Sequence, residues 1–250
     1  RRFAGLTLKV VAVVVPVAAV IAILLYLNTQ VSLFEPPFYQ DIHVAKGERM
    51  QIAFQDGTRV YLYPGSRLCY PDKFGLTERR VTLDGEAYLE VAKDEDKPFV
   101  LHTSRGDVRV LGTKFNVFNY SDKPLFETTL LQGAVEVDCG AKGGKLHLSP
   151  NEQVVLNDGK MLKRTVKEDE FLLWNEGLLY FDNQLLSYII LRLESYYDVK
   201  FVVQNRNCLK GRFTAKFRVG DDIKVILDAL INTGRFSYKL SVDNKIVYIQ

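Results

Sequence analysis

The sequence predicts a mainly β protein that ends in a small α+β module and begins with one long apolar segment. Three observations support this prediction. Apolar and polar residues alternate in many short stretches between residues 50 and 165, which is typical of strands with one buried face. Apolar residues recur at helical spacing in two stretches after residue 182. Residues 10–27 contain no charged side chain.

The composition is that of an ordinary globular protein. The chain has 250 residues, of which 47% are hydrophobic and 25% are charged, and this length accommodates two small domains. The formal net charge is +3, but Arg1, Arg2 and Lys9 precede the first acidic residue, and the rest of the chain carries 30 basic and 30 acidic residues. Because nucleic-acid binding depends on a surplus of Lys and Arg, this balance argues against that function.

Three cysteines and three histidines are scattered along the chain without the spacing of a metal or redox motif. They are Cys69, Cys139, Cys208, His43, His102 and His147. An odd number of cysteines cannot all pair within one chain, so free, buried thiols are expected, and one disulfide stays open as an alternative. We expect no metal site and no cofactor, because metal motifs bring several ligands together at short spacing.

Residues 10–27 are predicted to form a transmembrane helix. Eighteen residues at 1.5 Å each span about 27 Å, close to the roughly 30 Å hydrocarbon core of a bilayer. Basic residues precede this segment and uncharged polar residues follow it, so the N-terminus is expected in the cytoplasm and most of the chain in the periplasm. A cleaved signal peptide would have a shorter apolar core, and a buried core helix would carry a polar stripe. The predicted order is a cytoplasmic stub (1–9), the transmembrane helix (10–27) and a juxtamembrane linker (28–45).

Residues 46–170 are predicted to form an all-β domain. Asp56-Gly57 is a strong hairpin signal, because such turns require positive φ. The pattern alone leaves a sandwich, a barrel and a solenoid-like stack open. The predicted strands cover residues 50–54, 60–63, 67–70, 81–91, 99–102, 108–110, 113–118, 127–131, 134–137, 145–148, 153–156 and 161–165.

The strand at residues 81–91 and the chain that follows it contain the features that matter most for function. The odd-numbered residues of this strand are apolar, so its even-numbered residues, among them Glu86 and Glu90, are expected to face solvent. Further along, the apolar parity switches from even to odd beside Gly112-Thr113. Because a one-residue slip exchanges the two faces of a strand, a β-bulge or a sharp bend is predicted at Gly112.

Residues 171–250 are predicted to form a small α+β domain with the element order βαβ-βαββ. Asp182 or Asn183 is expected to cap the first helix, and Asp221 or Asp222 the second. The predicted strands cover residues 178–181, 200–203, 212–217, 237–242 and 245–249, and the helices end near Tyr197 and at Gly234.

Five phrases, which occur in one order between Asp56 and Leu156, resemble the FecR family of bacterial anti-sigma factors. They read DGTRVYLYPGSRLCYP, VTLDGEAYLEVAKDEDKPF, VLGTKFNVFNY, TLLQGAVEV and LSPNEQVVL. The part after Trp174 is similar to the C-terminal domain of this family, which looks like the signalling domains of secretins and TonB-dependent transducers. The resemblance implies an elongated, twisted β domain, solenoid- or sandwich-like, rather than a closed barrel.

The same resemblance implies a single-pass regulator of the inner membrane. In the family, the signalling domain of an outer-membrane TonB-dependent transporter engages the C-terminal module. Envelope proteases then cut the regulator stepwise and free an extracytoplasmic-function sigma factor. The chain begins at Arg1 without Met, so the cytoplasmic region that would hold the sigma factor is expected to lie outside it.

The resemblance also implies a candidate cleavage bond, because some members of the family cut themselves between a Gly and a Thr. The matching bond here is Gly112–Thr113. The Thr113 hydroxyl would attack the Gly112 carbonyl to form an ester, which water would hydrolyse, and backbone strain would lower the barrier. In the alternative interpretation, Gly112 permits a bend and Thr113 is an ordinary strand residue.

Other functional classes stay open at this point. No nucleotide-binding loop, nucleophile elbow or kinase signature is present, so no enzyme is expected apart from single-turnover self-cleavage. Glu86 and Glu90 could act as the carboxylate pair of a hydrolase only within a cleft. A periplasmic module that binds glycans or envelope polymers, or a structural adaptor of an envelope export complex, would use the same β-rich body.

Overall fold

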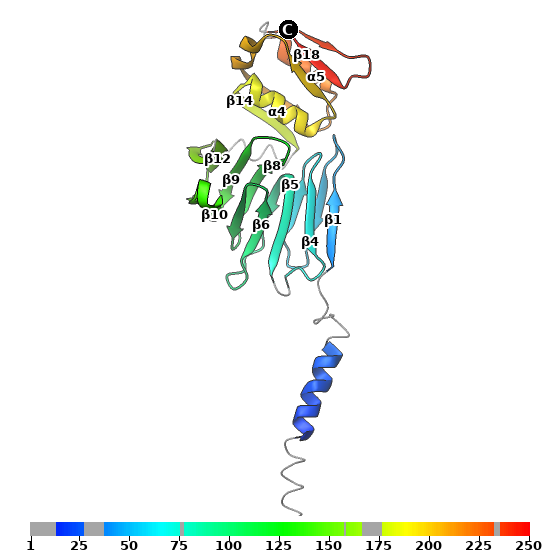
Figure 1. Cartoon of the computed structure of the whole chain (residues 1–250), viewed down its shortest axis with the longest axis vertical. Coiled ribbons are helices and arrows are strands. Elements are labelled where there is room, and N and C mark those ends of the chain that lie inside the picture. The colour runs from blue at the N-terminus through cyan, green and yellow to red at the C-terminus, as the bar shows by residue number, and fades with distance from the viewer. Residues whose placement is uncertain (1–13, 28–37, 76–77, 158, 167–176, 233–235) are drawn as a thin grey trace, which may run out of the picture. The chain divides into compact units, whose positions relative to one another are not determined.

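The computed structural model describes residues 14–27, 38–75, 78–157, 159–166, 177–232 and 236–250. Contacts divide the chain into Arg1–Phe38 and a compact unit, Tyr39–Gln250. Residues 14–27 are helical (Figure 1). The first four residues of the predicted span, 10–13, lie outside the described residues. Among the helices that are described, none has both the length and the apolar character needed to cross a membrane.

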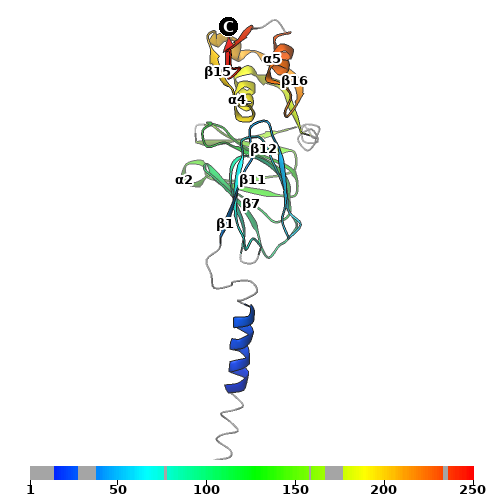
Figure 2. The same cartoon turned by 90° about the vertical axis from the view of Figure 1, so that its right-hand side faces the viewer.

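Thirteen strands of the described chain form one large sheet, which we call the β-rich region (residues 39–166) (Figures 1 and 2). The strands are β1 (Tyr39–His43), β2 (Met50–Ala53), β3 (Arg59–Leu62), β4 (Arg67–Pro71), β5 (Arg79–Glu90), β6 (Phe99–Thr103), β7 (Gly106–Val110), β8 (Lys114–Asn119), β9 (Phe126–Gln132), β10 (Val135–Asp138), β11 (Lys145–Leu148), β12 (Glu152–Asn157) and β13 (Lys160–Thr165). A short helix, α2 (Gly140–Gly143), precedes β11. The mainly β prediction is therefore confirmed.

The sheet turns around β5, which belongs to both of its halves. The first part of β5 pairs with β4 and β6, and the second part pairs with β3 and β8. Gly85, with φ of 137°, lies where β5 passes from one set of partner strands to the other. Because the two halves curve toward each other around a shared core, the sheet is nearly closed and barrel-like (Figures 1 and 2). It is therefore closer to a barrel than the elongated, solenoid- or sandwich-like domain that the resemblance implies.

Two expectations at the level of single elements change. Tyr39–His43, placed in the predicted linker, form β1, which pairs antiparallel with β4. The parity switch beside Gly112 marks the passage between two strands: β7 pairs with β6 and β10, whereas β8 pairs with β5 and β9. The predicted bend is present, since residues 111 and 112 form it. A register shift between Lys114 and Phe115 follows, two residues beyond the predicted position.

In the described parts of the C-terminal region (residues 177–250), there are two small sheets and two α-helices. In one sheet, β14 (Leu178–Leu185) pairs with β16 (Arg212–Arg218), and in the other, β18 (Ile246–Ile249) lies between β15 (Lys200–Val203) and β17 (Tyr238–Leu240). The helices are α4 (Leu186–Tyr196) and α5 (Ile223–Ile231), with a 3-10 helix at Arg206–Lys210.

One predicted helix cap is wrong and one is confirmed. Asn183 has φ of 50° at a register shift within β14, which continues to Leu185, so neither Asp182 nor Asn183 caps α4. The residues on either side, Phe181 and Gln184, pair with β16, so the strand continues past this position. Asp222 caps α5 as expected, because its side chain accepts a hydrogen bond from the Lys224 amide at 2.7 Å. The predicted helix end at Gly234 lies outside the described residues.

The described residues form two apolar cores, and the second includes residues of both regions. The first fills the curved sheet. The second is centred on α4 and includes four aromatic residues of the β-rich region, Tyr63, Tyr88, Phe118 and Tyr120. Burying one large apolar side chain contributes roughly 1.5–3 kcal/mol, more than a typical surface ion pair. Apolar packing therefore holds α4 against the sheet.

Candidate functional site

Helix α4 covers the face of the sheet that sequence alternation assigns to solvent. Glu86 and Tyr88 are even-numbered residues of β5, yet Glu86 is 0% exposed and Tyr88 is 3% exposed. The prediction of a solvated face is wrong for these two residues, because the C-terminal region packs on it. Glu90, at the end of the strand, is half-buried and pairs with Arg59 and Lys114.

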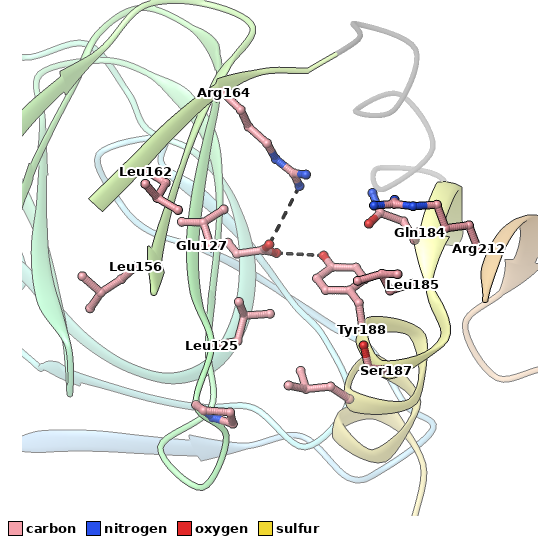
Figure 3. A pocket seen from close by; sticks show the side chains of 13 residues that line it. Leu125, Glu127, Leu156, Leu162, Arg164, Gln184, Leu185, Ser187, Tyr188 and Arg212 are labelled. Carbon is pink, nitrogen blue, oxygen red and sulfur yellow. Dashed lines mark hydrogen bonds and ion pairs between the residues drawn. The ribbon is translucent and has the colours of Figure 1, made fainter. Parts of the chain in front are cut away.

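A groove lies between the start of α4 and the part of the sheet that the helix leaves uncovered (Figure 3). Its volume is about 620 Å³. One wall is formed by β9, β12 and β13, and the other by the start of α4 with the adjoining ends of β14 and β16. Leu125, Val155, Leu156, Leu185 and Leu191 give it an apolar lining.

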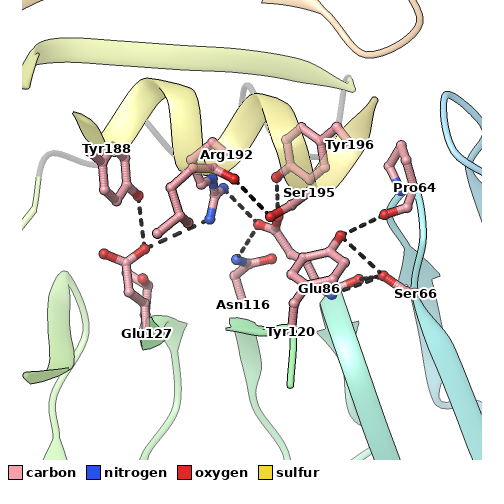
Figure 4. A network of polar contacts seen from close by, with 12 residues as sticks. Pro64, Ser66, Glu86, Asn116, Tyr120, Glu127, Tyr188, Arg192, Ser195 and Tyr196 are labelled. Atoms are coloured by element: carbon pink, nitrogen blue, oxygen red, sulfur yellow. Dashed lines mark hydrogen bonds and ion pairs between the residues drawn. The ribbon is translucent and has the colours of Figure 1, made fainter. Parts of the chain in front are cut away.

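Arg192 of α4 is the centre of a buried polar network beside this groove (Figure 4). Its side chain is 4% exposed. Nη2 donates to Glu86 Oε1 at 3.0 Å, and Nη1 lies 3.8 Å from Glu127 Oε2. The guanidinium carbon is also 4.2 Å from the Phe118 ring centroid, a desolvated cation–π contact. One cation thus contacts two carboxylates on different strands.

Glu86 is held by groups from both regions. Asn116 on β8 donates from Nδ2 to Oε1 at 2.9 Å, and the Tyr196 hydroxyl of α4 donates to Oε2. Burial lowers the pKa of Arg192, but Glu86, Tyr196, Tyr188 and Glu127 together outweigh this effect and the pKa is raised, so the guanidinium stays charged. A buried charge is tolerated only when it is paired in this way.

Glu127 on β9 is the second buried carboxylate. The Tyr188 hydroxyl of α4 donates to its Oε2 at 2.8 Å, and Arg164 on β13 lies 3.9 Å from its Oε1. Burial raises the pKa of Glu127, although Arg192 opposes the effect. We call these five residues, Glu86, Glu127, Tyr188, Arg192 and Tyr196, the Arg192 network.

Polar contacts at the other end of α4 reinforce the junction. Lys46, in the turn after β1, donates from Nζ to the carbonyls of Glu194 and Ser195, where the helix leaves carbonyl groups without partners. The Gly47 amide donates to the Tyr196 carbonyl at 2.9 Å. Lys123 donates to the Glu194 carboxylate, also at 2.9 Å. The helix is therefore attached to the β-rich region at both ends.

The predicted cleavage bond lies elsewhere in the β-rich region. Thr113 is 2% exposed, and its hydroxyl donates to the Ala134 carbonyl at 2.9 Å. A Cβ atom at Gly112 would lie 2.6 Å from Lys93 Cα, so glycine is required there by close approach of the backbone. This geometry explains the bend.

The remaining sequence candidates do not come together into a site. Cys69, Cys139 and Cys208 are free thiols. Within the described residues, no group of three or more His, Cys, Asp or Glu side chains could hold a metal ion.

Sequence reasoning missed the Arg192 network, but a signal for it exists. Tyr188, Arg192 and Tyr196 recur at intervals of four, so they share one face of α4. A cation between two tyrosines on the apolar side of a helix indicates a buried acid on the opposing surface.

Two family models match this chain. The family model described as FecR protein matches residues 40–136, and the one described as FecR, C-terminal matches residues 178–249. No curated protein matches the chain.

Two crystal structures are similar to it, both of a provisionally assigned anti-sigma factor from Parabacteroides distasonis ATCC 8503. The first, at 1.65 Å resolution, has a TM-score of 0.75 and 30% identity, and the match covers 84% of this chain and 98% of that one. The second, at 2.50 Å resolution, has a TM-score of 0.74 and 30% identity, with 85% and 98% covered.

Proposed function

The chain belongs to the FecR family, and from this premise we propose that it is an anti-sigma regulator that relays a signal across the cell envelope. An outer-membrane TonB-dependent transporter supplies the signal through its periplasmic signalling domain. A cytoplasmic extracytoplasmic-function sigma factor receives it, and envelope proteases release that factor. The anti-sigma role follows from the family. What we add as a proposal is the transporter that sends the signal, the proteases that release the sigma factor, and the direction of the relay.

The observation that carries this proposal is the attachment of α4 to the sheet by the Arg192 network. A partner that shifts α4 must separate Arg192 from Glu86 and Glu127, which are buried on β5 and β9. Because unpaired buried charges are costly, such a shift changes the stability of the β-rich region as well. Binding at the C-terminal region is thereby transmitted to the strands.

The C-terminal region offers an edge for the transporter's signalling domain. Among the described strands, β15 pairs only with β18, so its other edge can accept an added strand. Val202, on β15, is 39% exposed. In this proposal residues 46–170 and 171–250 are the two domains of the regulator, and the second one receives the partner.

We place the protein at the inner membrane, with the apolar sequence of residues 10–27 as its anchor and the basic residues before it on the cytoplasmic side. Self-cleavage at Gly112–Thr113 belongs to the same proposal. The bend and the buried Thr113 hydroxyl beside the bond are compatible with an N-to-O acyl shift.

The test is a pull-down with the full chain as bait from a detergent-solubilised envelope, followed by mass spectrometry. We expect to recover a TonB-dependent transporter. The variant Val202→Lys should lose it, whereas Val225→Lys, at a more exposed valine on α5, should retain it. Recovery of polysaccharide alone would favour the glycan-binding alternative, and recovery of the bait's own oligomer alone would favour an export-complex adaptor. Either result would contradict the relay.

A further inference from the structure

Strand β13 leaves one edge of the large sheet without a neighbour among the described strands. It pairs with β12 on one side only. The backbone groups of an open edge can hydrogen-bond an added strand, which is how sheets bind extended peptides. Leu162, in the middle of β13, is 56% exposed, so a large apolar side chain lies in solvent at this edge.

The groove described above runs along this edge (Figure 3). Glu127 on β9 and Leu162 on β13 both lie opposite Val155 on β12, so the three side chains form one row across the sheet. Tyr188 of α4 contacts Glu127, at the inner end of the row, and the helix does not extend to Leu162. The groove as a whole has the volume of a small-ligand or peptide pocket.

The charges at the groove select an acidic occupant. Arg164 and Leu162 share one face of β13, because the side-chain period of a strand is two. Arg164 donates to Gln153 Oε1 at 2.5 Å and lies 3.9 Å from the buried Glu127 carboxylate, but its side chain is 46% exposed, so its outer nitrogens can also bind an incoming carboxylate. Arg212 lines the opposite wall of the groove. Two guanidinium groups thus flank the apolar lining.

The same charges disfavour a second copy of this chain as the occupant. Pairing two β13 edges would bring Lys160, Lys163 and Arg164 of each copy toward the same residues of the other. Like charges across a strand pair are destabilising, and lysine on an edge strand is a common protection against such association.

We propose that β13 and the groove bind an extended segment of a partner protein, which adds to the sheet as a strand beside β13. The segment places an apolar side chain beside Leu162 and an acidic side chain, two residues away, beside Arg164. This site goes beyond the proposed function, because it lies in the β-rich region and is separate from the β15 edge. Each site can therefore be disproved without the other.

The test is a selection of displayed seven-residue peptides on the full chain in mild detergent, followed by fluorescence anisotropy of the enriched peptides. We expect the enriched sequences to share an apolar residue and an acidic residue at positions i and i+2. Leu162→Glu should weaken their binding by at least about tenfold, because it removes the apolar contact and adds a like charge. Thr82→Glu adds the same charge at an exposed position of β5, away from the groove, and should bind as the wild type does.

Two further measurements identify the mode of binding. Arg164→Glu should reverse the preference, so that a peptide with Lys in place of its acidic residue binds better than the original. N-methylation of the peptide amides that face β13 should abolish binding, because strand addition depends on those donors.

Three outcomes would overturn the proposal. One is no enrichment, or enrichment of peptides that bind Leu162→Glu as well as the wild type. Another is that no peptide is enriched but oleate binds to the wild type and not to Leu162→Glu, which would assign the groove to a lipid. The third is enrichment only after residues 167–176 are replaced by a Gly-Ser sequence, which would make the chain's own segment the occupant.

Discussion

Arg192 on α4 donates a hydrogen bond to Glu86 on β5 across 106 positions of sequence, with 3.0 Å between Nη2 and Oε1. Both side chains are buried. This pair fixes the orientation of the helix on the sheet, whereas the surrounding aromatic residues supply most of the favourable burial. The relationship makes the junction of the two regions sensitive to single substitutions.

Removal of Arg192 should destabilise the protein strongly. Arg192→Met leaves Glu86 buried without its cation, and breaking a buried pair in this way typically costs about 3–5 kcal/mol. The double variant Glu86→Leu/Arg192→Met should lose less than the sum of the two single variants, because neither charge is left unpaired. Urea unfolding of all three variants measures the effect.

A surface pair provides the control for this cycle. Arg67 and Asp41 form a bidentate ion pair between exposed side chains. Arg67→Met should therefore unfold close to the wild-type midpoint. If Arg67→Met and Arg192→Met lowered the free energy of unfolding equally, burial would not be what makes the Arg192 network important for stability.

Glu127 should make stability depend on pH. Its pKa is raised by burial above the ordinary value of 4.5, so the folded chain binds this proton more tightly than the unfolded chain does. The contribution of Glu127 is therefore most favourable below pH 4.5 and is lost as the pH rises through the folded-state pKa. Glu127→Gln removes this loss and still accepts from the Tyr188 hydroxyl.

The measurement is the free energy of unfolding of Glu127→Gln and wild type from pH 4 upward. The difference should move in favour of the variant as the pH increases through that window. A difference that is constant with pH, or one that moves in favour of the wild type, would show that Arg192 fully compensates the burial of the carboxylate.

Gly85 should tolerate no side chain. A Cβ atom there would lie 2.4 Å from Ser66 Oγ and 2.6 Å from Ser66 Cα, and φ is 137°. Gly85→Ala should therefore displace the turn before β4, which bonds to β5 through Ser66. Gly57→Ala is the matched control, because its positive φ costs about 1–2 kcal/mol while its nearest contact is an ordinary 3.9 Å. Thermal unfolding should show a clearly larger loss for Gly85→Ala, and equal losses would contradict the steric argument.

Cleavage at Gly112–Thr113 should depend on the Thr113 hydroxyl. Thr113→Ala should leave the chain intact, and Thr113→Ser should still yield a fragment that begins at residue 113, because serine keeps the nucleophile. Thr128→Ala, which removes another buried threonine hydroxyl, should be cleaved as the wild type is. Intact-mass spectrometry distinguishes these products. Two fragments from Thr113→Ala would exclude the mechanism.

The sequence by itself determined most of the strands and the cap of α5. Period-two alternation and the Asp56-Gly57 turn are local signals, and the predicted strands in the β-rich region recur in the structure within one or two residues of their ends. The bend at Gly112 was equally local, since the switch of parity is visible in the chain on either side of it.

Only the tertiary structure decided that both faces of β5 are buried, how the sheet closes, and where α4 begins. Alternation shows which face of a strand is polar, but a polar face can still be buried when another element supplies hydrogen-bond and ion-pair partners. Helix α4 does this for Glu86 and Glu127, with Tyr188, Arg192 and Tyr196. Those partners are between 61 and 110 positions away in sequence. No local pattern in β5 contains them, because the groups that compensate the buried charge of Glu86 include the guanidinium and hydroxyl groups of another region.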